Sequence, residues 1–193
     1  MKTRYGIEDE AFIRGDVPMT KREIRAMLMV QAKLSPSDWV LDIGAGTGSI
    51  TIEAALAVPE GHVYAVERFH KGIVLIQENC KKFGLTNVSI IEAKAPDGLA
   101  DLPALDVIFV GGSGGALPGI LDQAERLLKP GGRCILTSVT VETTAKVTEE
   151  LRHRPFTYEG FQMQVNRLRK AGSYHLLDPL SPITIITAVK NKE

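Results

Sequence analysis

Short apolar runs alternate with longer stretches of helical periodicity along most of the chain. Trp39 to Ile43 is too short for a helix and ends at glycines, so it predicts a buried strand. Comparable runs predict strands over residues 62–67, 88–92, 105–110, 134–139, 156–165 and 183–189. Helices are predicted over residues 49–57, 71–83, 117–128 and 141–152. This alternation of strands and helices predicts an α/β fold.

The N-terminal part of the chain is predicted to be a cap segment and a helix, over residues 1–35. Residues 1–17 are expected to be irregular and to lie on the surface. Thr20-Lys21-Arg22-Glu23 has the pattern of a capping box, which would start a helix that ends before Ser35-Pro36. Two interpretations stay open: the helix covers one edge of the sheet, or Pro18–Thr20 also sits over the mouth of a ligand site.

Three glycines at alternate positions follow the first predicted strand and precede its helix. Glycine lets the backbone approach a ligand closely, and a helix N-terminus directs its free N–H groups toward that ligand. The acid and glycines of the motif are Asp42, Gly44, Gly46 and Gly48. A dinucleotide site has the spacing G-x-G-x-x-G instead, and here Ser49 stands where its last glycine would be. A tight turn without a ligand is the alternative, which the backbone entropy of three glycines disfavours.

An acid ends the second predicted strand. Glu67 lies about 20 residues beyond the glycine loop, where a carboxylate at a strand end can accept both hydroxyls of a ribose. A charged strand end that is merely solvated is the alternative. The glycine motif upstream favours the ribose role.

The connection between the last two predicted strands is long and basic. Arg167, Arg169 and Lys170 place three positive charges within four residues of it. Loops of this length in a compact domain are usually functional or disordered, and such cations could pair with substrate carboxylates. A solvated hairpin tip and an oligomer contact are equally open. Residues 166–182 are therefore predicted to be a substrate or oligomer loop.

Composition narrows the class of protein. Of 193 residues, 44% are apolar and 24% charged, as in an ordinary soluble domain, and 23 basic residues balance 23 acidic ones. This balance gives no indication of a nucleic-acid or membrane surface, and no apolar run is long enough to span a bilayer. Cys80 and Cys134 are expected to be reduced thiols in a cytoplasmic protein, with one disulfide left open. The four histidines are scattered, so no metal site is expected.

The motif over residues 42–48 resembles motif I of the class I S-adenosylmethionine (SAM) methyltransferases. That resemblance implies a Rossmann-like, seven-stranded sheet, parallel except for a final antiparallel strand, with helices on both faces. More narrowly, nearly the whole chain resembles the (cobalt-)precorrin-6B or precorrin-6Y C15-methyltransferases (decarboxylating) of cobalamin biosynthesis. The resemblance is carried by Glu10–Arg14, Val17–Arg25, Asp42–Gly48 and Val110–Gly115.

This family resemblance implies methylation of C15 of a tetrapyrrole, with loss of CO₂ from the C12 acetate. It implies a single 1–193 domain that forms a homotetramer, with no nucleic-acid or membrane partner. SAM contacts are expected at Thr20, Asp42, Gly44, Ala45, Gly46, Thr47, Gly48, Glu67 and Ala95. Substrate contacts are expected at Gly112, Ser113, Gly114, Arg167, Arg169 and Lys170, with Arg14 or Lys21 as further candidates. Where related methyltransferases often carry an adenine-binding Asp, this chain has Lys94, so adenine would rest on backbone near Ala95.

Methyl transfer from SAM does not depend on a strong catalytic acid or base, and no catalytic residue is assigned from the sequence. Methyl transfer from a sulfonium depends chiefly on positioning, because the electrophile is already activated. The second hypothesis is a SAM methyltransferase that acts on tRNA or on protein isoaspartyl residues. Net neutrality and the absence of an aromatic base-stacking motif weigh against tRNA. An interaction module that has lost its cofactor is a third hypothesis, and a nicotinamide enzyme ranks last.

Overall fold

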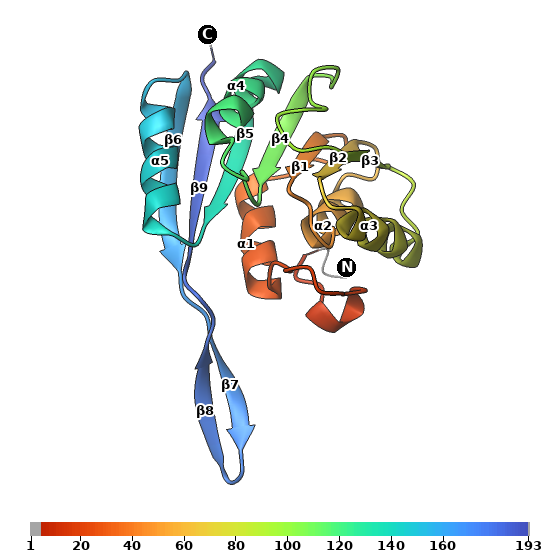
Figure 1. Cartoon of the computed structure of the whole chain (residues 1–193), viewed down its shortest axis with the longest axis vertical. Coiled ribbons are helices and arrows are strands. Elements are labelled where there is room, and N and C mark those ends of the chain that lie inside the picture. Colours follow the sequence, from red (N-terminus) through yellow and green to blue (C-terminus); the bar gives the residue numbers. More distant parts are fainter. Residues whose placement is uncertain (1–4, 193) are drawn as a thin grey trace.

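The computed structural model describes residues 5–192; residues 1–4 of the predicted irregular segment and Glu193 lie outside the described residues. Figure 1 shows a twisted sheet flanked by helices, with one hairpin that extends away from it. The strands are β1 (Trp39–Ile43), β2 (His62–Glu67), β3 (Val88–Glu92), β4 (Leu105–Val110), β5 (Leu128–Ser138), β6 (Phe156–Met163), β7 (Asn166–Ala171), β8 (Tyr174–Pro179) and β9 (Ile183–Lys190). The helices are η1 (Asp9–Ala11), α1 (Arg22–Ala32), α2 (Ser49–Ala57), α3 (His70–Phe83), α4 (Leu117–Leu127) and α5 (Val141–Arg152).

Seven strands form one sheet in the order β3-β2-β1-β4-β5-β9-β6. All neighbouring pairs are parallel except the two that involve β9, which runs antiparallel to both β5 and β6. The predicted fold class and the antiparallel final strand are thus confirmed. The order brings the carboxyl ends of β1 and β4 together at the point where the strand order reverses, which is where open α/β sheets bind ligands.

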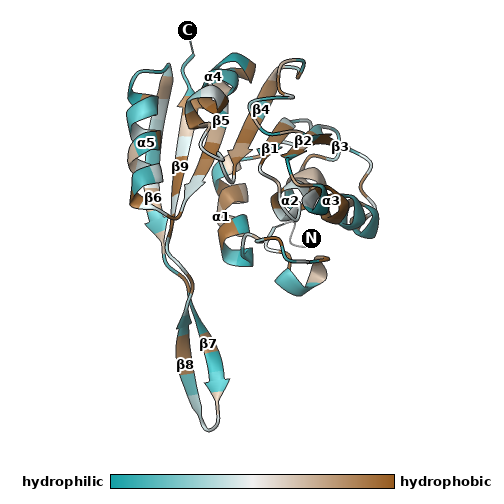
Figure 2. Cartoon of the chain, in the orientation of Figure 1, coloured by the Kyte–Doolittle hydropathy of each residue, from teal (hydrophilic) through white to brown (hydrophobic). Residues whose placement is uncertain are grey.

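The central strands β1 and β4 are buried on both faces over most of their length, which explains why they are largely apolar, whereas the edge strand β6 is mostly exposed (Figure 2). Along β4, Val107 and Phe109 pack on the face covered by α1 and α2, whereas Ile108 and Val110 pack on the face covered by α4 and α5. Helix α3 adds Ile76 against Ala65 of β2. Helices on both faces are therefore confirmed.

The predicted capping box does not form. Helix α1 begins at Arg22, and its N-cap residue, Lys21, makes no side-chain cap hydrogen bond. The Arg22 N–H instead donates a hydrogen bond of 3.0 Å to Asp9 Oδ1. Asp9 belongs to a segment that was expected to be irregular and on the surface. That expectation is wrong for η1 and its neighbour, since Asp9 and Phe12 are both buried. A distant acid thus caps the helix where the local pattern predicted Thr20 would.

The predicted 166–182 loop is for the most part a β-hairpin. Strands β7 and β8 pair antiparallel, from Asn166↔Pro179 to Ala171↔Tyr174, and form a sheet of their own (Figure 1). The predicted strand starting at Cys134 also begins earlier, because β5 includes residues 128–133 and Leu128 pairs with Leu105.

Both cysteines have free thiols, so the reduced alternative is confirmed. Burial raises the pKa of both, that of Cys134 to about 12. Over the described residues, every helix falls short of the length and apolar character that a membrane span requires.

Candidate functional site

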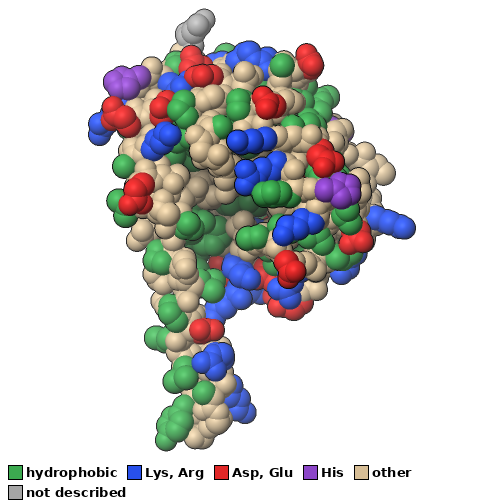
Figure 3. Space-filling view, viewed as in Figure 1, with side chains coloured by type: hydrophobic (Ala, Val, Ile, Leu, Met, Phe, Trp, Pro, Cys, Tyr) green, Lys and Arg blue, Asp and Glu red, His purple; other side chains and the backbone are tan. Residues whose placement is uncertain are grey.

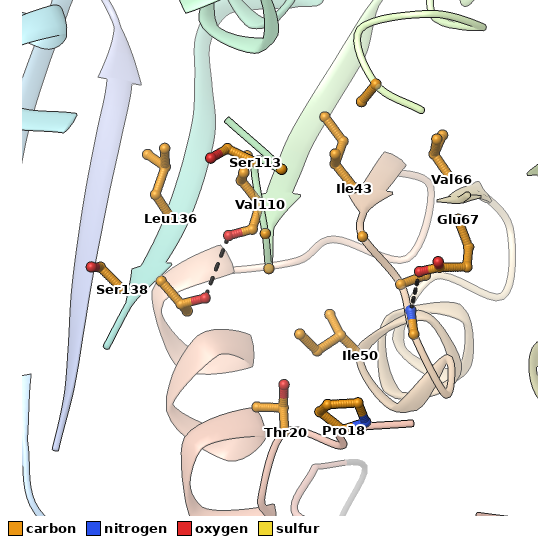
Figure 4. A pocket seen from close by; sticks show the side chains of 18 of the residues that line it. Pro18, Thr20, Ile43, Ile50, Val66, Glu67, Val110, Ser113, Leu136 and Ser138 are labelled. Atoms are coloured by element: carbon orange, nitrogen blue, oxygen red, sulfur yellow. Dashed lines mark hydrogen bonds between the residues drawn. The ribbon is translucent and has the colours of Figure 1, made fainter. Parts of the chain in front are cut away.

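A cavity of about 620 Å³ opens beside the glycine loop, at the carboxyl ends of β1, β2, β4 and β5. This volume lies within the range of small-molecule sites. Figure 3 shows a hollow with hydrophobic side chains inside and basic side chains around it. Figure 4 shows how the elements meet: Pro18 and Thr20 face Val110 and Leu136 across the cavity, with Glu67 at one end.

The three glycines of the motif make three different close contacts, and all three have positive φ angles. A Cβ on Gly44 would lie 3.3 Å from backbone atoms of Gly112, and one on Gly46 would lie 3.4 Å from the Pro18 carbonyl oxygen. Gly44 and Gly46 therefore let two other loops approach. Gly48 serves the packing of α2 on α3, since its Cβ would lie 3.0 Å from Ile76 Cγ1, and Gly48 does not line the cavity.

Asp42 is fully buried behind the glycine loop and is not on the cavity wall. Its Oδ2 accepts a 2.6 Å hydrogen bond from Thr51 Oγ1 in α2, while Oδ1 has no partner among the described residues. Burial, with a smaller contribution from the charge of Glu67, raises the pKa of Asp42 to about 6. This hydrogen bond connects Asp42 to α2, so the geometry gives no support to the predicted contact between Asp42 and SAM.

Glu67 lies on the cavity wall, as the ribose hypothesis requires (Figure 4). Its Oε2 accepts from the Gly46 N–H, and Oε1 accepts from the N–H groups of Arg68 and Phe69, all at 2.9 Å. Gly72 makes room for it, because a Cβ there would lie 2.7 Å from Glu67 Cγ. The carboxylate is thereby fixed in orientation beside the glycine loop. Its contact with a ribose stays a prediction.

Thr47 supplies an unpartnered hydroxyl at the same wall. It is buried, and its Oγ1 has no hydrogen-bond partner within residues 5–192. Its backbone is anchored, since Asn79 Nδ2 donates to the Thr47 carbonyl at 3.0 Å. A fixed, unsatisfied hydroxyl on the wall of a cavity is a feature of a site built for a polar ligand. The residues present thus fit the methionine part of SAM.

The cap segment is held over the cavity by a buried arginine that the sequence analysis missed. Arg25 has no exposed surface; its Nε donates to Glu53 Oε1 at 2.9 Å, and its Nη1 donates to Asp9 Oδ1 at 2.8 Å. It also donates to the carbonyls of Thr20 and Ile7. The detectable signal was Glu53, the one charged residue in helix α2, because a charged side chain on a helix of mostly apolar residues requires a partner when it is buried.

The structure brings most predicted site residues to one cavity and leaves others outside it. On the wall lie Thr20, Gly44, Ala45, Gly46, Thr47, Glu67, Ala95, Gly112, Ser113 and Gly114. Within the described residues the wall includes none of the predicted hairpin cations. Arg167 Nη2 donates to Glu23 Oε2 at 2.6 Å and lies 3.5 Å from Asp9 Oδ2, whereas Arg169 and Lys170 lie farther along the exposed hairpin. Lys21 lies on the wall, but Arg14 does not.

The model of a precorrin methyltransferase domain matches residues 10–190. The chain belongs to the precorrin methyltransferase family. Family membership agrees with the sequence resemblance carried by Val17–Arg25, the glycine motif and the glycine-rich loop after β4.

Individual members of the family match almost end to end. A Pyrobaculum calidifontis protein named probable cobalt-precorrin-6B C(15)-methyltransferase (decarboxylating) is 40% identical over 187 residues, 95% of both chains. The cobalt-precorrin-6B C(15)-methyltransferase (decarboxylating) of Salmonella typhimurium is 35% identical and covers 96% of this chain and 97% of its own. The crystal structure of precorrin-6y C5,15-methyltransferase from Geobacter metallireducens superposes with a TM-score of 0.92 at 38% identity, covering 97% and 98%.

Proposed function

We propose that this protein is a SAM-dependent C-methyltransferase that methylates C15 of a (cobalt-)precorrin and removes the carboxyl of its C12 acetate as CO₂. The observation that carries this function is the match, over 95% or more of both chains, to relatives named for that reaction. These relatives favour a tetrapyrrole acceptor over the tRNA and isoaspartyl alternatives.

The cavity wall supports SAM as the methyl donor. The cradle of Gly44 and Gly46 and the free hydroxyl of Thr47 would hold the methionine part, and Glu67 the ribose hydroxyls. Backbone near Ala95 would receive the adenine. When bound, SAM supplies a methyl group on a positively charged sulfonium. The chain's own contribution is to fix that sulfonium and the acceptor in line, since positioning accounts for much of such catalysis.

The opposite half of the cavity is suited to a broad acceptor. The loop after β4 is built of glycines and Ser113, and a Cβ on Gly112 or Gly115 would meet no atom within 4 Å. Apolar side chains, among them Leu117, Leu136 and Val147, complete this half. A carboxylate held against them would lose its water shell, which destabilises the ionised group relative to a transition state whose charge spreads into the ring. The bond between the acetate methylene and the carboxylate carbon then breaks, CO₂ leaves, and the bonding electrons pass into the ring.

A homo-oligomer, a tetramer by family resemblance, is part of the proposal. The hairpin supports it, because Leu168, Tyr174 and Leu177 are 72%, 75% and 68% exposed on a pair of strands with no layer against them (Figure 2). Apolar side chains gathered on a projecting element mark protein–protein contacts. Light scattering of a Leu168→Glu and Leu177→Glu double variant tests this: loss of the assembly is expected, and an unchanged mass excludes the hairpin as the contact. A cytoplasmic location stays a prediction.

The decisive experiment is a mass spectrum of the product formed from cobalt-precorrin-6B and SAM. The expected product has gained one methyl group and lost CO₂. Gain of a methyl on tRNA or on an isoaspartyl peptide, with none on the tetrapyrrole, would overturn the proposed function. Calorimetry with S-adenosylhomocysteine, the demethylated product of SAM, separates enzyme from module: absence of binding at millimolar ligand would indicate a fold that has lost its cofactor.

A further inference from the structure

The charge of the cavity wall differs from that of the chain. Acidic and basic residues balance at 23 each over the whole sequence. On the wall, the charged residues are Lys21, Glu67, Arg68 and Lys94. Three cations and one carboxylate leave a formal excess of two positive charges.

None of these cations forms an ion pair with an acid among the described residues, although the charge of Lys21 lowers the pKa of Asp9. Over residues 5–192, every ion pair of 4.0 Å or less involves other basic residues than Lys21, Arg68 and Lys94. Glu67, the only acid on the wall among residues 5–192, accepts hydrogen bonds from three backbone N–H groups. The positive charge is therefore available to a ligand.

Arg68 has a defined position that reaches across the cavity. It follows Glu67 at the end of β2, and its guanidinium carbon lies 4.3 Å from the centre of the Phe69 ring. Its Nη1 lies 3.6 Å from where a Cβ on Gly114 would be, so the guanidinium sits against the glycine loop that forms the acceptor side of the cavity. Stacking on an aromatic ring orients the planar group and leaves its N–H donors free along the edge.

SAM does not account for this charge. SAM has a sulfonium, an ammonium and one carboxylate, and is therefore a net cation, which an excess of positive charge on the wall repels. An anionic second ligand would be attracted by the same wall and would also offset that repulsion. The charge thus belongs to the acceptor.

We propose that Arg68 and Lys94 form a carboxylate-binding edge for the acceptor, which orients a polycarboxylate macrocycle over the glycine loop. Arg68 would bind one carboxylate through two parallel N–H bonds, and Lys94 would bind a neighbouring one as a point charge. Lys94 stands where related methyltransferases often carry an adenine-binding acid. Binding of an acceptor carboxylate would explain why this chain has a lysine at that position. The assignment rests on the proposed function and names the residues that select its substrate by charge.

Fluorescence titration tests this edge with stable planar tetrapyrroles and S-adenosylhomocysteine-saturated protein. The probes are coproporphyrin, which has four carboxylates, and its neutral tetramethyl ester. Arg68→Ala is expected to weaken coproporphyrin binding about ten- to a hundredfold, the range of a charge-assisted hydrogen bond. Arg68→Lys should recover part of the loss, and Lys94→Met should lower affinity further in the double variant. Ester binding should not change, and Lys82→Ala, which removes an exposed α3 cation outside the cavity, is the matched control.

The outcomes separate this inference from the function on which it rests. If the native protein binds coproporphyrin, and Arg68→Ala and Lys94→Met each change that affinity by less than twofold, the carboxylate edge is overturned. The proposed methyltransferase function would not be affected by that result. Equal losses for coproporphyrin and its ester would also overturn it, because they would indicate lost shape and not lost charge. The proposed function fails separately, if cobalt-precorrin-6B gains no methyl with the native protein.

Discussion

Arg25 and Arg68 show two uses of the same side chain. Arg25 has no exposed surface, and its guanidinium binds two carboxylates and two carbonyls. Arg68 is exposed at the cavity and has no acidic partner within the described chain. A charged side chain that is paired within the protein stabilises the fold, whereas a charged side chain without an acidic partner at a cavity can bind a ligand.

The two regions are also coupled. The Arg25 cluster holds the Thr20 carbonyl, and with it the cap segment that forms the wall opposite Glu67 (Figure 4). The shape of the ligand site thus depends on a charge cluster outside it. Substitutions at Arg25 should therefore alter stability first and binding as a consequence, and substitutions at Arg68 should alter binding alone.

The largest effect is expected from Arg25→Ala. It would leave Glu53 buried without a cation and Asp9 with only the more distant Arg167, and breaking a buried pair from one side costs about 3–5 kcal/mol of unfolding free energy. Urea unfolding followed by circular dichroism measures it. Arg25→Lys, which keeps the charge but loses donors, provides a milder variant in case Arg25→Ala does not fold.

Arg22→Ala is the matched control for the Arg25 experiment. Arg22 lies on the same helix and pairs with Glu8. The Arg22 side chain is partly exposed and that of Glu8 largely exposed, so the loss of this pair should cost less than about 1 kcal/mol. Similar losses for the two variants would mean that burial does not distinguish these arginines.

Asp42 is intermediate between Arg25 and Arg68, because one of its oxygens has a hydrogen-bond partner and the other has none among the described residues. Its pKa is raised from 3.8 to about 6, which at 1.36 kcal/mol per unit makes its ionised form cost about 3 kcal/mol. A raised pKa means that this cost is absent below pH 4, grows as the pH rises toward 6 and is complete above it. Relative to the native protein, Asp42→Asn should therefore gain stability between pH 4 and pH 7.

Unfolding free energies at pH 4, 5, 6 and 7 test that pH dependence. Asp101→Asn, an exposed acid, is the control and should follow the native curve. A constant difference between Asp42→Asn and the native protein across this range would show that Asp42 does not titrate there.

Much of the architecture could be predicted because local patterns determine it. β1 and β4 are apolar runs buried on both faces, and α5 was predicted with its observed bounds, Val141–Arg152. The insertion of β9 between β5 and β6 could not be predicted, since pairing order depends on contacts far apart in the sequence. The segment around Arg167 and Arg169 contains too few apolar residues for its pattern to distinguish a projecting hairpin from a loop.

The site was predictable where backbone geometry defines it and not where distant side chains meet. Gly44, Gly46 and Glu67 follow from the spacing of one strand–loop–helix unit and the next strand. The contact between Arg25 and Asp9 could not be predicted from sequence, because the capping-box pattern already offered a local explanation for how helix α1 begins. Arg68 was overlooked, since only the fold brings it against Gly114.

A smaller effect is expected from Arg167→Ala, which tests a partly exposed member of the same charge network. Arg167 bonds to Glu23 at 2.6 Å, and this bond lowers the pKa of Glu23. The side chain of Arg167 is 39% exposed, so solvent screening limits the loss to less than about 1 kcal/mol. A lowered pKa gives stability that is present above pH 4.5 and disappears as the pH falls further, so the variant and the native protein should converge in acid.

Thermal unfolding at pH 7 and pH 3 measures this difference, with Arg169→Ala as control. Arg169 is 60% exposed and lies 3.9 Å from Asp178, so its removal should leave the curve unchanged. A loss for Arg167→Ala that is as large at pH 3 as at pH 7 would exclude the Glu23 pair as its source.

The smallest effect is expected in the balance between SAM and S-adenosylhomocysteine. The two differ by the methyl group and the sulfonium charge, and unit charges across a wet cleft interact by a few tenths to about 1 kcal/mol. Arg68→Ala should therefore raise affinity for SAM about two- to fivefold relative to S-adenosylhomocysteine, and 0.5 M salt should remove the difference. Calorimetry with both ligands measures the ratio. If Arg68→Ala leaves the ratio unchanged at low salt, the guanidinium is too far from the sulfonium to oppose it, and the charge of the wall acts on the acceptor alone.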